Sequence, residues 1–259
     1  MLYSIAGWPS LLRGLRPHMF FNLSVAILTA VMTSIPYMPK IIGIAVAPLP
    51  IVQLYTAWVH IAVSAPSPKP FLRRFPNFIA AFRATALPTA TMWLAVGVAQ
   101  ELPLLMYSVL EIDTFAWDPT GSGDAGATVA VPFLDLGRPI DILKLMAICA
   151  AWLAPTAAFV VPAHAVLTRV QASMLPADEH PIISFDRSFG GCRAEGVERP
   201  INMFQAWRSL SLAAWLRLYI LYVKVFLITF GASIFMAAAI GIQILIVWSN
   251  LKKNSSSES

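Results

Sequence analysis

The chain alternates between long apolar runs and shorter segments that hold its charged and turn-forming residues. Five runs reach about 20 residues, the length that an α-helix needs to cross a hydrocarbon core of about 30 Å. These runs cover residues 18–38, 41–64, 85–110, 142–167 and 218–248. The pattern predicts an all-α fold, a multi-pass transmembrane helical bundle of about five spans that forms a single membrane domain over residues 1–259.

The first two runs lie close together in the sequence. Arg13 and Arg16 precede the first run, as basic residues precede the apolar part of a secretory signal. This run is long and ends without a small-x-small cleavage site, so we interpret it as a retained signal anchor. Pro48 and Pro50 interrupt the second run, and only a short link separates it from the first. We interpret the pair as a helical hairpin.

The distribution of Lys and Arg predicts the orientation, because cytosolic loops are rich in these residues. A cytosolic N-terminus gives a cytosolic loop 168–217 and an outer loop 111–141, in which six acidic residues face the single Arg138. The C-terminus is then lumenal or external. Lys252 and Lys253 oppose this orientation, since they would favour the cytosolic side.

Two segments carry apolar residues at helical spacing beside basic residues, which is typical of helices that lie in the membrane interface. The first covers 71–83, with its first turn expected at Pro76, and the second runs into the fifth span. Their apolar faces are formed by Phe71, Phe75, Phe78 and Phe82, and by Met203, Trp207, Leu210 and Ala214. Such segments either anchor the chain among membrane lipids or recognise a lipid substrate.

Composition supports a membrane protein and argues against other classes. The chain is 58% hydrophobic and 12% charged, with a mean hydropathy of +0.71. The net charge is +5, but the basic residues lie between the apolar runs and form no basic stripe. We therefore expect no nucleic-acid partner. Cys149 and Cys192 lack the close spacing of a metal site or a redox dithiol. We predict no metal site and no cofactor.

Known catalytic motifs give little support for an enzyme. Gly121-Ser-Gly-Asp-Ala-Gly126 matches the dinucleotide fingerprint in letters only, because a Gly-rich acidic loop surrounds it instead of a strand and a helix. Glu111, Asp113 and Asp118 could hold a metal diphosphate, but they share no helical face and are typical of a solvated loop. The sequence also lacks a phosphate-binding Walker loop, a His-Glu-x-x-His pair and a Gly-x-Ser-x-Gly elbow.

Polar residues within the apolar runs are the candidate functional residues, because ionisable groups are costly inside a membrane. His60, His164 and Lys224 fall within about 10 Å of the cytosolic ends of their spans, so we expect them to share one level. His60 and His164 are candidate substrate-binding residues. Each can equally be a hydrogen-bonded interface residue, and Lys224 can extend to the headgroups.

Glu101 is the candidate catalytic residue. It lies about 25 Å along the third run from the cytosolic side, and a carboxyl there is expected to be neutral and able to donate a proton. Pro103 removes a helix hydrogen bond nearby, and prolines in neighbouring runs could open a pocket. Glu101 is either a general acid or a buried acid bonded to Gln100 or to another helix.

The loop 168–217 contains Pro181-Ile-Ile-Ser-Phe-Asp-Arg-Ser-Phe-Gly-Gly, and Pro66-Ser-Pro-Lys-Pro comes earlier. With these segments the chain resembles a group of uncharacterised multi-pass integral membrane proteins of filamentous fungi. The resemblance implies an endomembrane location, such as the endoplasmic reticulum, and a part in lipid or secondary metabolism, but no catalytic residue. Taken on its own, the motif predicts a compact turn with a local ion pair involving Asp186 and Arg187.

Three functions remain compatible with the sequence. The first is an accessory or scaffold subunit that positions a membrane enzyme in endomembrane lipid or secondary metabolism. The second is a membrane-embedded cyclase or isomerase that acts on a lipophilic terpenoid or polyketide, with Glu101 as the proton donor. The third is a transporter, although the inverted repeats of many secondary transporters are not visible.

Overall fold

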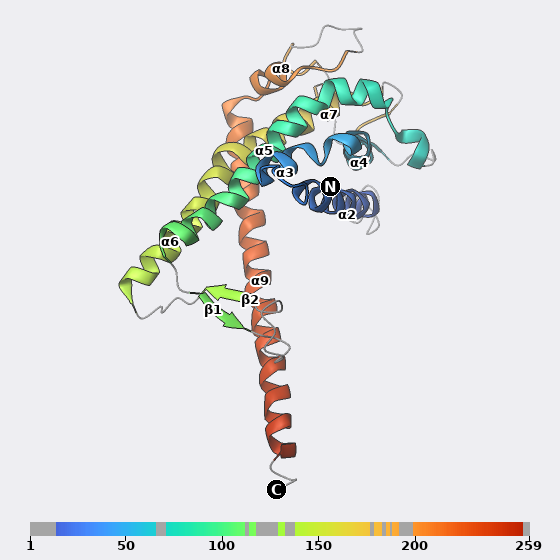
Figure 1. The fold of residues 1–259 in the computed structure, drawn as a ribbon. Coiled ribbons are helices and arrows are strands. Elements are labelled where there is room, and N and C mark those ends of the chain that lie inside the picture. The colour runs from blue at the N-terminus through green and yellow to red at the C-terminus, as the bar shows by residue number, and fades with distance from the viewer. Residues whose placement is uncertain are drawn as a thin grey trace. The chain divides into compact units, whose positions relative to one another are not determined.

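The computed structural model describes residues 14–65, 71–111, 114–117, 129–132, 138–176, 179–182, 185–186, 188–191 and 199–255 (Figure 1). The described chain divides into two compact units, Met1–Ser209 and Leu210–Ser259. Each unit is described by itself below.

Five helical stretches are long and apolar enough to cross a membrane, as the sequence predicted. They are Leu15–Thr33, Lys40–Val63, Phe78–Val109, Pro139–Ser173 and Leu212–Gln243. The third stretch begins seven residues before its predicted start at 85, and the fourth continues six residues beyond its predicted end at 167. The all-α multi-pass fold is confirmed, with these boundaries corrected.

The first two stretches form the expected hairpin, and the second is broken at its prolines. Helix α2 (Leu15–Thr33) is followed by α3 (Lys40–Val46), a 3-10 turn η2 (Leu49–Ile51) and α4 (Val52–Val63). Pro48 and Pro50 cannot donate backbone hydrogen bonds, which explains why the regular helix stops between α3 and α4.

Helix α5 (Phe78–Val109) is the longest of the first unit and runs through Pro88 and Pro103 without a break. It begins at Asn77, whose side chain accepts hydrogen bonds from the backbone N–H groups of Ile79 and Ala80. This N-cap satisfies orphan donors of the first turn. It therefore places the start of α5 earlier than the hydrophobic pattern indicated.

The fourth stretch consists of α6 (Pro139–Pro155), a π-helical turn η4 (Thr156–Val160) and α7 (Val161–Ser173). The π-turn lies between Pro155 and Pro162, each of which lacks the N–H that a regular α-helix would use. The widened turn lets the span continue past both prolines. The expected interruption of this span is therefore local.

The sequence predicted one interfacial helix over 71–83, and this prediction is wrong because the segment forms two separate elements. Phe71–Arg74 form a 3-10 turn η3, and α5 starts at Phe78 after the extended residue Asn77. Phe75 packs against the core, whereas Phe78 and Phe82 are exposed on the first turns of α5 with ring centroids 5.7 Å apart. Pro76 precedes the N-cap and is not the first residue of a helix.

The second predicted interfacial helix is shorter than expected. Helix α8 (Met203–Arg208) ends before Ser209, so Leu210 and Ala214 do not share its face. A capping box, in which Asn202 and Gln205 bond each other's backbone N–H groups, fixes its start. Ala206 is buried, while Phe204 and Trp207 are exposed. Met203 packs against buried residues of the first unit, whereas Trp207 stays exposed, as a residue that contacts lipid would be.

The loop between the third and fourth candidate spans contains a short hairpin that the sequence pattern did not indicate. Strand β1 (Thr114–Trp117) pairs antiparallel with β2 (Val129–Pro132), with Thr114 opposite Pro132. The Gly-rich segment 121–126 and the acidic residues Asp113 and Asp118 lie outside the described residues.

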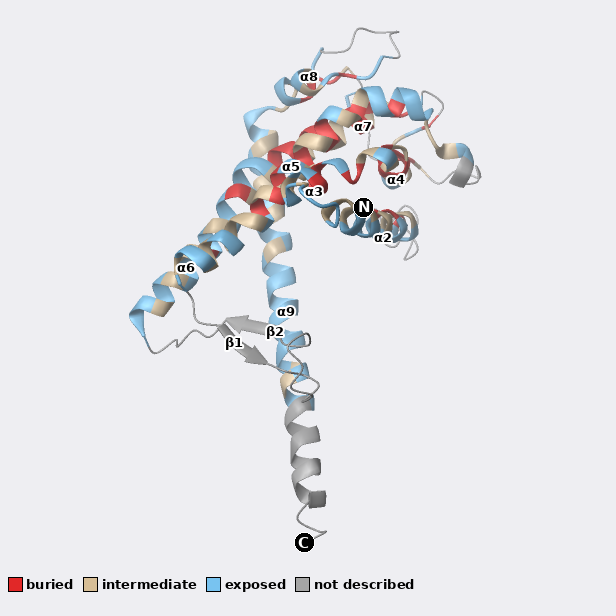
Figure 2. Ribbon diagram, viewed as in Figure 1, coloured by how far each residue is buried: buried red, intermediate tan, exposed pale blue. Residues whose placement is uncertain are grey.

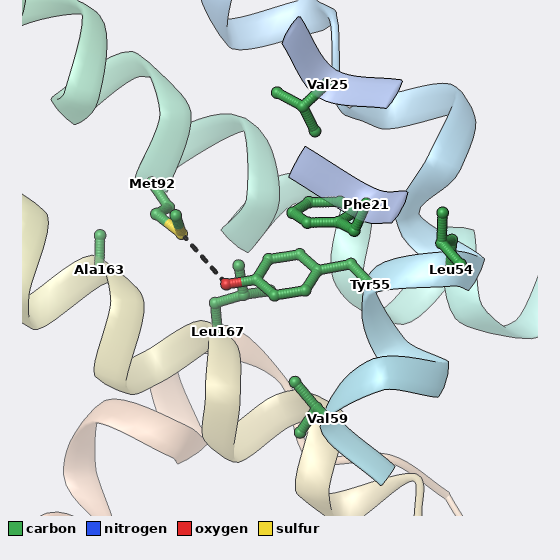
Figure 3. Packing of buried hydrophobic residues seen from close by; sticks show 8 residues of the cluster. All are labelled: Phe21, Val25, Leu54, Tyr55, Val59, Met92, Ala163 and Leu167. Carbon is green, nitrogen blue, oxygen red and sulfur yellow. Dashed lines mark hydrogen bonds between the residues drawn. The ribbon is translucent and has the colours of Figure 1, made fainter. Parts of the chain in front are cut away.

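The core of the first unit lies where α2, α4, α5 and α7 meet (Figures 2 and 3). Figure 3 shows Tyr55 directed between Met92 and Leu167, with its hydroxyl 3.9 Å from the Met92 sulfur. The rings of Phe21 and Tyr55 stack with centroids 4.5 Å apart, which joins α2 to α4. The full cluster comprises Phe21, Val25, Leu54, Tyr55, Val59, Met92, Ala163 and Leu167.

The second unit is a single helix, α9 (Leu212–Ser255), which contains the fifth candidate span. None of the most apolar window of this span is buried within the structure. An unburied helix that is apolar all round is suited to contact lipid. Lys224 lies on an exposed position of α9, so its predicted level relative to the two histidines stays a prediction.

Candidate functional site

A group of buried polar side chains lies where the end of α4 meets the end of α7. We call His60, Ser64, Gln171, Ser173 and Glu179 the polar cluster. All five are at most 7% exposed. Buried polar groups are costly unless they are bonded, so such a group in a hydrophobic chain needs a role.

His60 connects the two helices through its ring. Its Nε2 atom lies 2.9 Å from the backbone carbonyl oxygen of Gln171. A carbonyl can only accept, so Nε2 carries the proton and donates. His60 therefore joins the end of α4 to the last turn of α7.

Backbone hydrogen bonds beside the polar cluster attach the chain after α7 to the end of α4. The backbone N–H of Ala65 donates to the His180 carbonyl at 2.7 Å, and that of Ile182 donates to the Val63 carbonyl at 2.9 Å. Ser64 and Pro181 form an isolated antiparallel bridge. A short piece of β-type pairing thus joins residues 63–65 to 180–182.

Ser173 extends this attachment to the segment before α8. Its hydroxyl donates to the Val170 carbonyl at 2.7 Å and accepts from the backbone N–H of Ile201 at 3.1 Å. Ile201 belongs to a second buried cluster with Val166, Val170, Phe189 and Ala206. Several points of the loop between the fourth and fifth spans are therefore held on α7.

Two members of the cluster, Gln171 and Ser64, have side chains without a hydrogen-bond partner among the described residues. Gln171 is fully buried, and neither its Oε1 nor its Nε2 has a hydrogen-bond partner among the residues that the structure describes. An unsatisfied buried amide costs about 1–3 kcal/mol for each lost bond. This amide could bond a water molecule or the polar end of a small ligand.

The predicted site residues do not come together. His60 contacts α7 at Gln171, which follows His164 by seven residues, or about 10 Å along the helix. His164 is half-buried and lies deeper in the span than predicted, because α7 continues to Ser173. The two histidines therefore do not lie at the same height along the helices, contrary to the prediction from the sequence. Their binding of a substrate stays a prediction.

Glu101 lies apart from the polar cluster, on the half-buried side of α5. Pro103 lies within the continuous helix and deprives the buried Ala99 carbonyl of its usual donor. Gln100, next to Glu101, is exposed. The general-acid role of Glu101 and the cavity beside it remain predictions.

The motif around Phe185 forms the compact turn that the sequence predicted. The Asp186 carboxylate accepts hydrogen bonds from the backbone N–H groups of Ser188 at 2.8 Å and Gly190 at 2.9 Å. Phe189, Gly190 and Gly191 all have positive φ, a conformation that glycine adopts without strain. Arg187, the expected ion-pair partner, lies outside the described residues, as does Cys192.

Sequence reasoning missed Gln171, Ser173 and Glu179 because it ended the fourth span at 167. One signal could have found Gln171: it follows His164 by seven residues, so both fall on one face of a continued helix. Within the described ranges, no group of three or more His, Cys, Asp or Glu side chains could hold a metal ion. Comparisons with family models, curated proteins and solved structures found no match to this chain.

Proposed function

We propose that this protein is an accessory or scaffold subunit of an endomembrane and that its loop between the fourth and fifth spans positions a partner enzyme. The orientation proposed from the charge distribution puts this loop in the cytosol. The setting in endomembrane lipid or secondary metabolism rests on the resemblance to fungal membrane proteins.

The observation that carries this proposal is the use of the polar cluster. His60 is 2% exposed, and its Nε2 donates to a backbone carbonyl instead of facing a substrate cavity. Around it, backbone bonds from Ala65 and Ile182 hold the loop on the helix ends. Buried polar groups and backbone bonds that fix a loop on the helix ends suit a protein whose loop offers a rigid binding surface to a partner.

A membrane-embedded cyclase or isomerase is the second candidate. Glu101 favours it, because a half-buried carboxyl in the outer part of a long apolar helix is a possible proton donor to a lipophilic substrate. Such an enzyme would need Glu101 in its acid form, and a scaffold would not.

One experiment distinguishes the two functions. The tagged chain is expressed at its native level in a strain that lacks the gene, as wild type, Glu101→Gln, His60→Leu or His164→Leu. Native electrophoresis of detergent extracts then reports the size of the complex, and profiling of lipids and small metabolites reports the product.

A scaffold predicts that the wild-type chain migrates in a complex larger than the isolated 28.3 kDa chain in the same detergent. His60→Leu should reduce both the complex and the product, while Glu101→Gln and the matched control His164→Leu should keep both. Loss of product in Glu101→Gln with the complex intact would instead identify an acid catalyst. A wild-type chain that migrates alone would contradict the scaffold.

A further inference from the structure

A hollow of about 360 Å³ lies between the last turns of α7 and the turn at 185–191. Its lining residues are Thr168, Arg169, Ala172, Phe185, Asp186 and Phe189. The volume is at the small end of the range of about 300–1,000 Å³ for ligand sites. It therefore suits a lipid headgroup or another small polar molecule rather than a whole lipid.

The hollow presents a cation, an anion and aromatic rings together. The Arg169 guanidinium carbon lies 5.5 Å from the centre of the Phe189 ring, a cation–π contact that orients the side chain. The rings of Phe185 and Phe189 are 5.8 Å apart and inclined at 53°. Asp186 is exposed, and each of its oxygens retains acceptor capacity beyond its bond to the backbone.

Asp186 is kept ionised by its own turn. The Ser188 side chain and the backbone N–H groups of Gly190 and Ser188 bond the carboxylate and lower the pKa of Asp186 below its ordinary value. Arg169 contributes in the same direction through its charge. The hollow therefore carries one positive and one negative charge at neutral pH.

The hollow lies near one end of the fourth candidate span, whose 35 residues are more than the hydrocarbon core requires. Arg169 is four residues before the end of the fourth candidate span at Ser173, or about 6 Å along the helix. Headgroup regions extend about 5–7 Å beyond the hydrocarbon core on each side. The neighbouring helix α8 exposes Phe204 and Trp207, residue types that are common at membrane interfaces.

We propose that this hollow binds a zwitterionic phosphoester headgroup, with its phosphate on Arg169 and its choline or ethanolamine ammonium against Phe185 and Asp186. Arg169 donates planar N–H groups suited to a phosphate. Phe185 and Asp186 offer an aromatic ring and a negative charge to the ammonium. Asp186 disfavours a headgroup of net negative charge, and Arg169 disfavours a simple cation.

The test measures binding to the full-length chain in a non-ionic detergent by native mass spectrometry. Probes are dihexanoyl phosphatidylcholine, dihexanoyl phosphatidylglycerol, free phosphocholine and inorganic phosphate. We expect phosphatidylcholine to bind about two- to fivefold more tightly than phosphatidylglycerol, the size of one partly exposed charge interaction. Binding of the lipid alone identifies a membrane lipid as the source, and equal binding of phosphocholine identifies a soluble ester.

Three variants test the assignment of residues. Arg169→Gln and Asp186→Asn should each weaken phosphatidylcholine binding by about two- to fivefold. Ala172→Leu should block the hollow, and so weaken phosphatidylcholine binding, without changing any charge. It tests the site independently if Asp186→Asn disturbs the turn. Arg208→Gln, which removes an exposed charge of α8 outside the hollow, is the matched control and should bind as wild type.

Gel filtration of each variant confirms that it is folded. The proposal is overturned if phosphatidylglycerol or inorganic phosphate binds as tightly as phosphatidylcholine. It is also overturned if the folded Arg169→Gln and Ala172→Leu variants retain wild-type binding.

Discussion

Replacement of Gly97 by leucine should separate α5 from α3. A Cβ atom at Gly97 would lie 3.3 Å from Cγ2, 3.4 Å from Cα and 3.5 Å from the carbonyl oxygen of Ile41. Two of these atoms are backbone, which cannot rotate away, and leucine adds three further carbons beyond Cβ. Overpacking of this kind costs about 1–3 kcal/mol. Leucine also favours the helix over glycine by about 0.8–1 kcal/mol, which offsets part of the cost.

Gly231→Leu is the matched control, because a Cβ at Gly231 in α9 would meet no atom within 4 Å. Both variants gain the same helix propensity, so their difference isolates the overpacking of about 1–3 kcal/mol. At about 2–4 °C per kcal/mol for a chain of this size, Gly97→Leu should melt about 2–12 °C below Gly231→Leu.

The assay is the loss of the monodisperse peak in gel filtration after detergent-solubilised protein is heated. Ile41→Ala introduced together with Gly97→Leu should recover part of the loss, since it removes the nearest side-chain atom. Equal melting temperatures for Gly97→Leu and Gly231→Leu would refute the close crossing of α3 and α5.

Two further predictions concern the turn and the topology. The pKa of Asp186 is lowered in the folded protein. Its carboxylate therefore stabilises the turn at 185–191 fully when the pH is above the ordinary pKa of an aspartate. This stabilisation is lost as the pH falls through the lowered pKa. Cleavage of the turn by an acid protease should therefore increase toward low pH more steeply in wild type than in Asp186→Asn, and identical profiles would contradict this. If the C-terminus is lumenal, a C-terminal tag with its own glycosylation sequon should be modified and protected from cytosolic protease. An unmodified, digestible tag would reverse the proposed side of the C-terminus.

The number and type of spans could be predicted from the sequence because a bilayer demands long apolar helices. Their ends could not, because local bonds decide them. The Asn77 cap makes α5 begin at Phe78, seven residues before the start that the apolar pattern indicated. The fourth span continues past its predicted end at 167, because α7 accommodates Arg169 over the ring of Phe189.

The polar cluster could be predicted only in part. His60 was a candidate because it is ionisable within an apolar run, but its partner Gln171 is 111 residues away in the sequence. Contacts at that separation depend on how α4 and α7 pack, which hydrophobic periodicity does not specify. By contrast, the capping box of α8 is local, and the spacing of Asn202 and Gln205 could have revealed it.

Amide hydrogen exchange of the full-length protein in lipid nanodiscs tests most directly whether His60 holds the loop on the helices. In wild type, the amides of Ala65 and Ile182 should be protected, because they donate to His180 and Val63. His60→Leu removes the bond from the ring to the Gln171 carbonyl, so exchange at both amides should accelerate, while His164→Leu should leave it unchanged. Fast exchange at both amides in wild type, or equal rates in all three proteins, would contradict the role of the polar cluster.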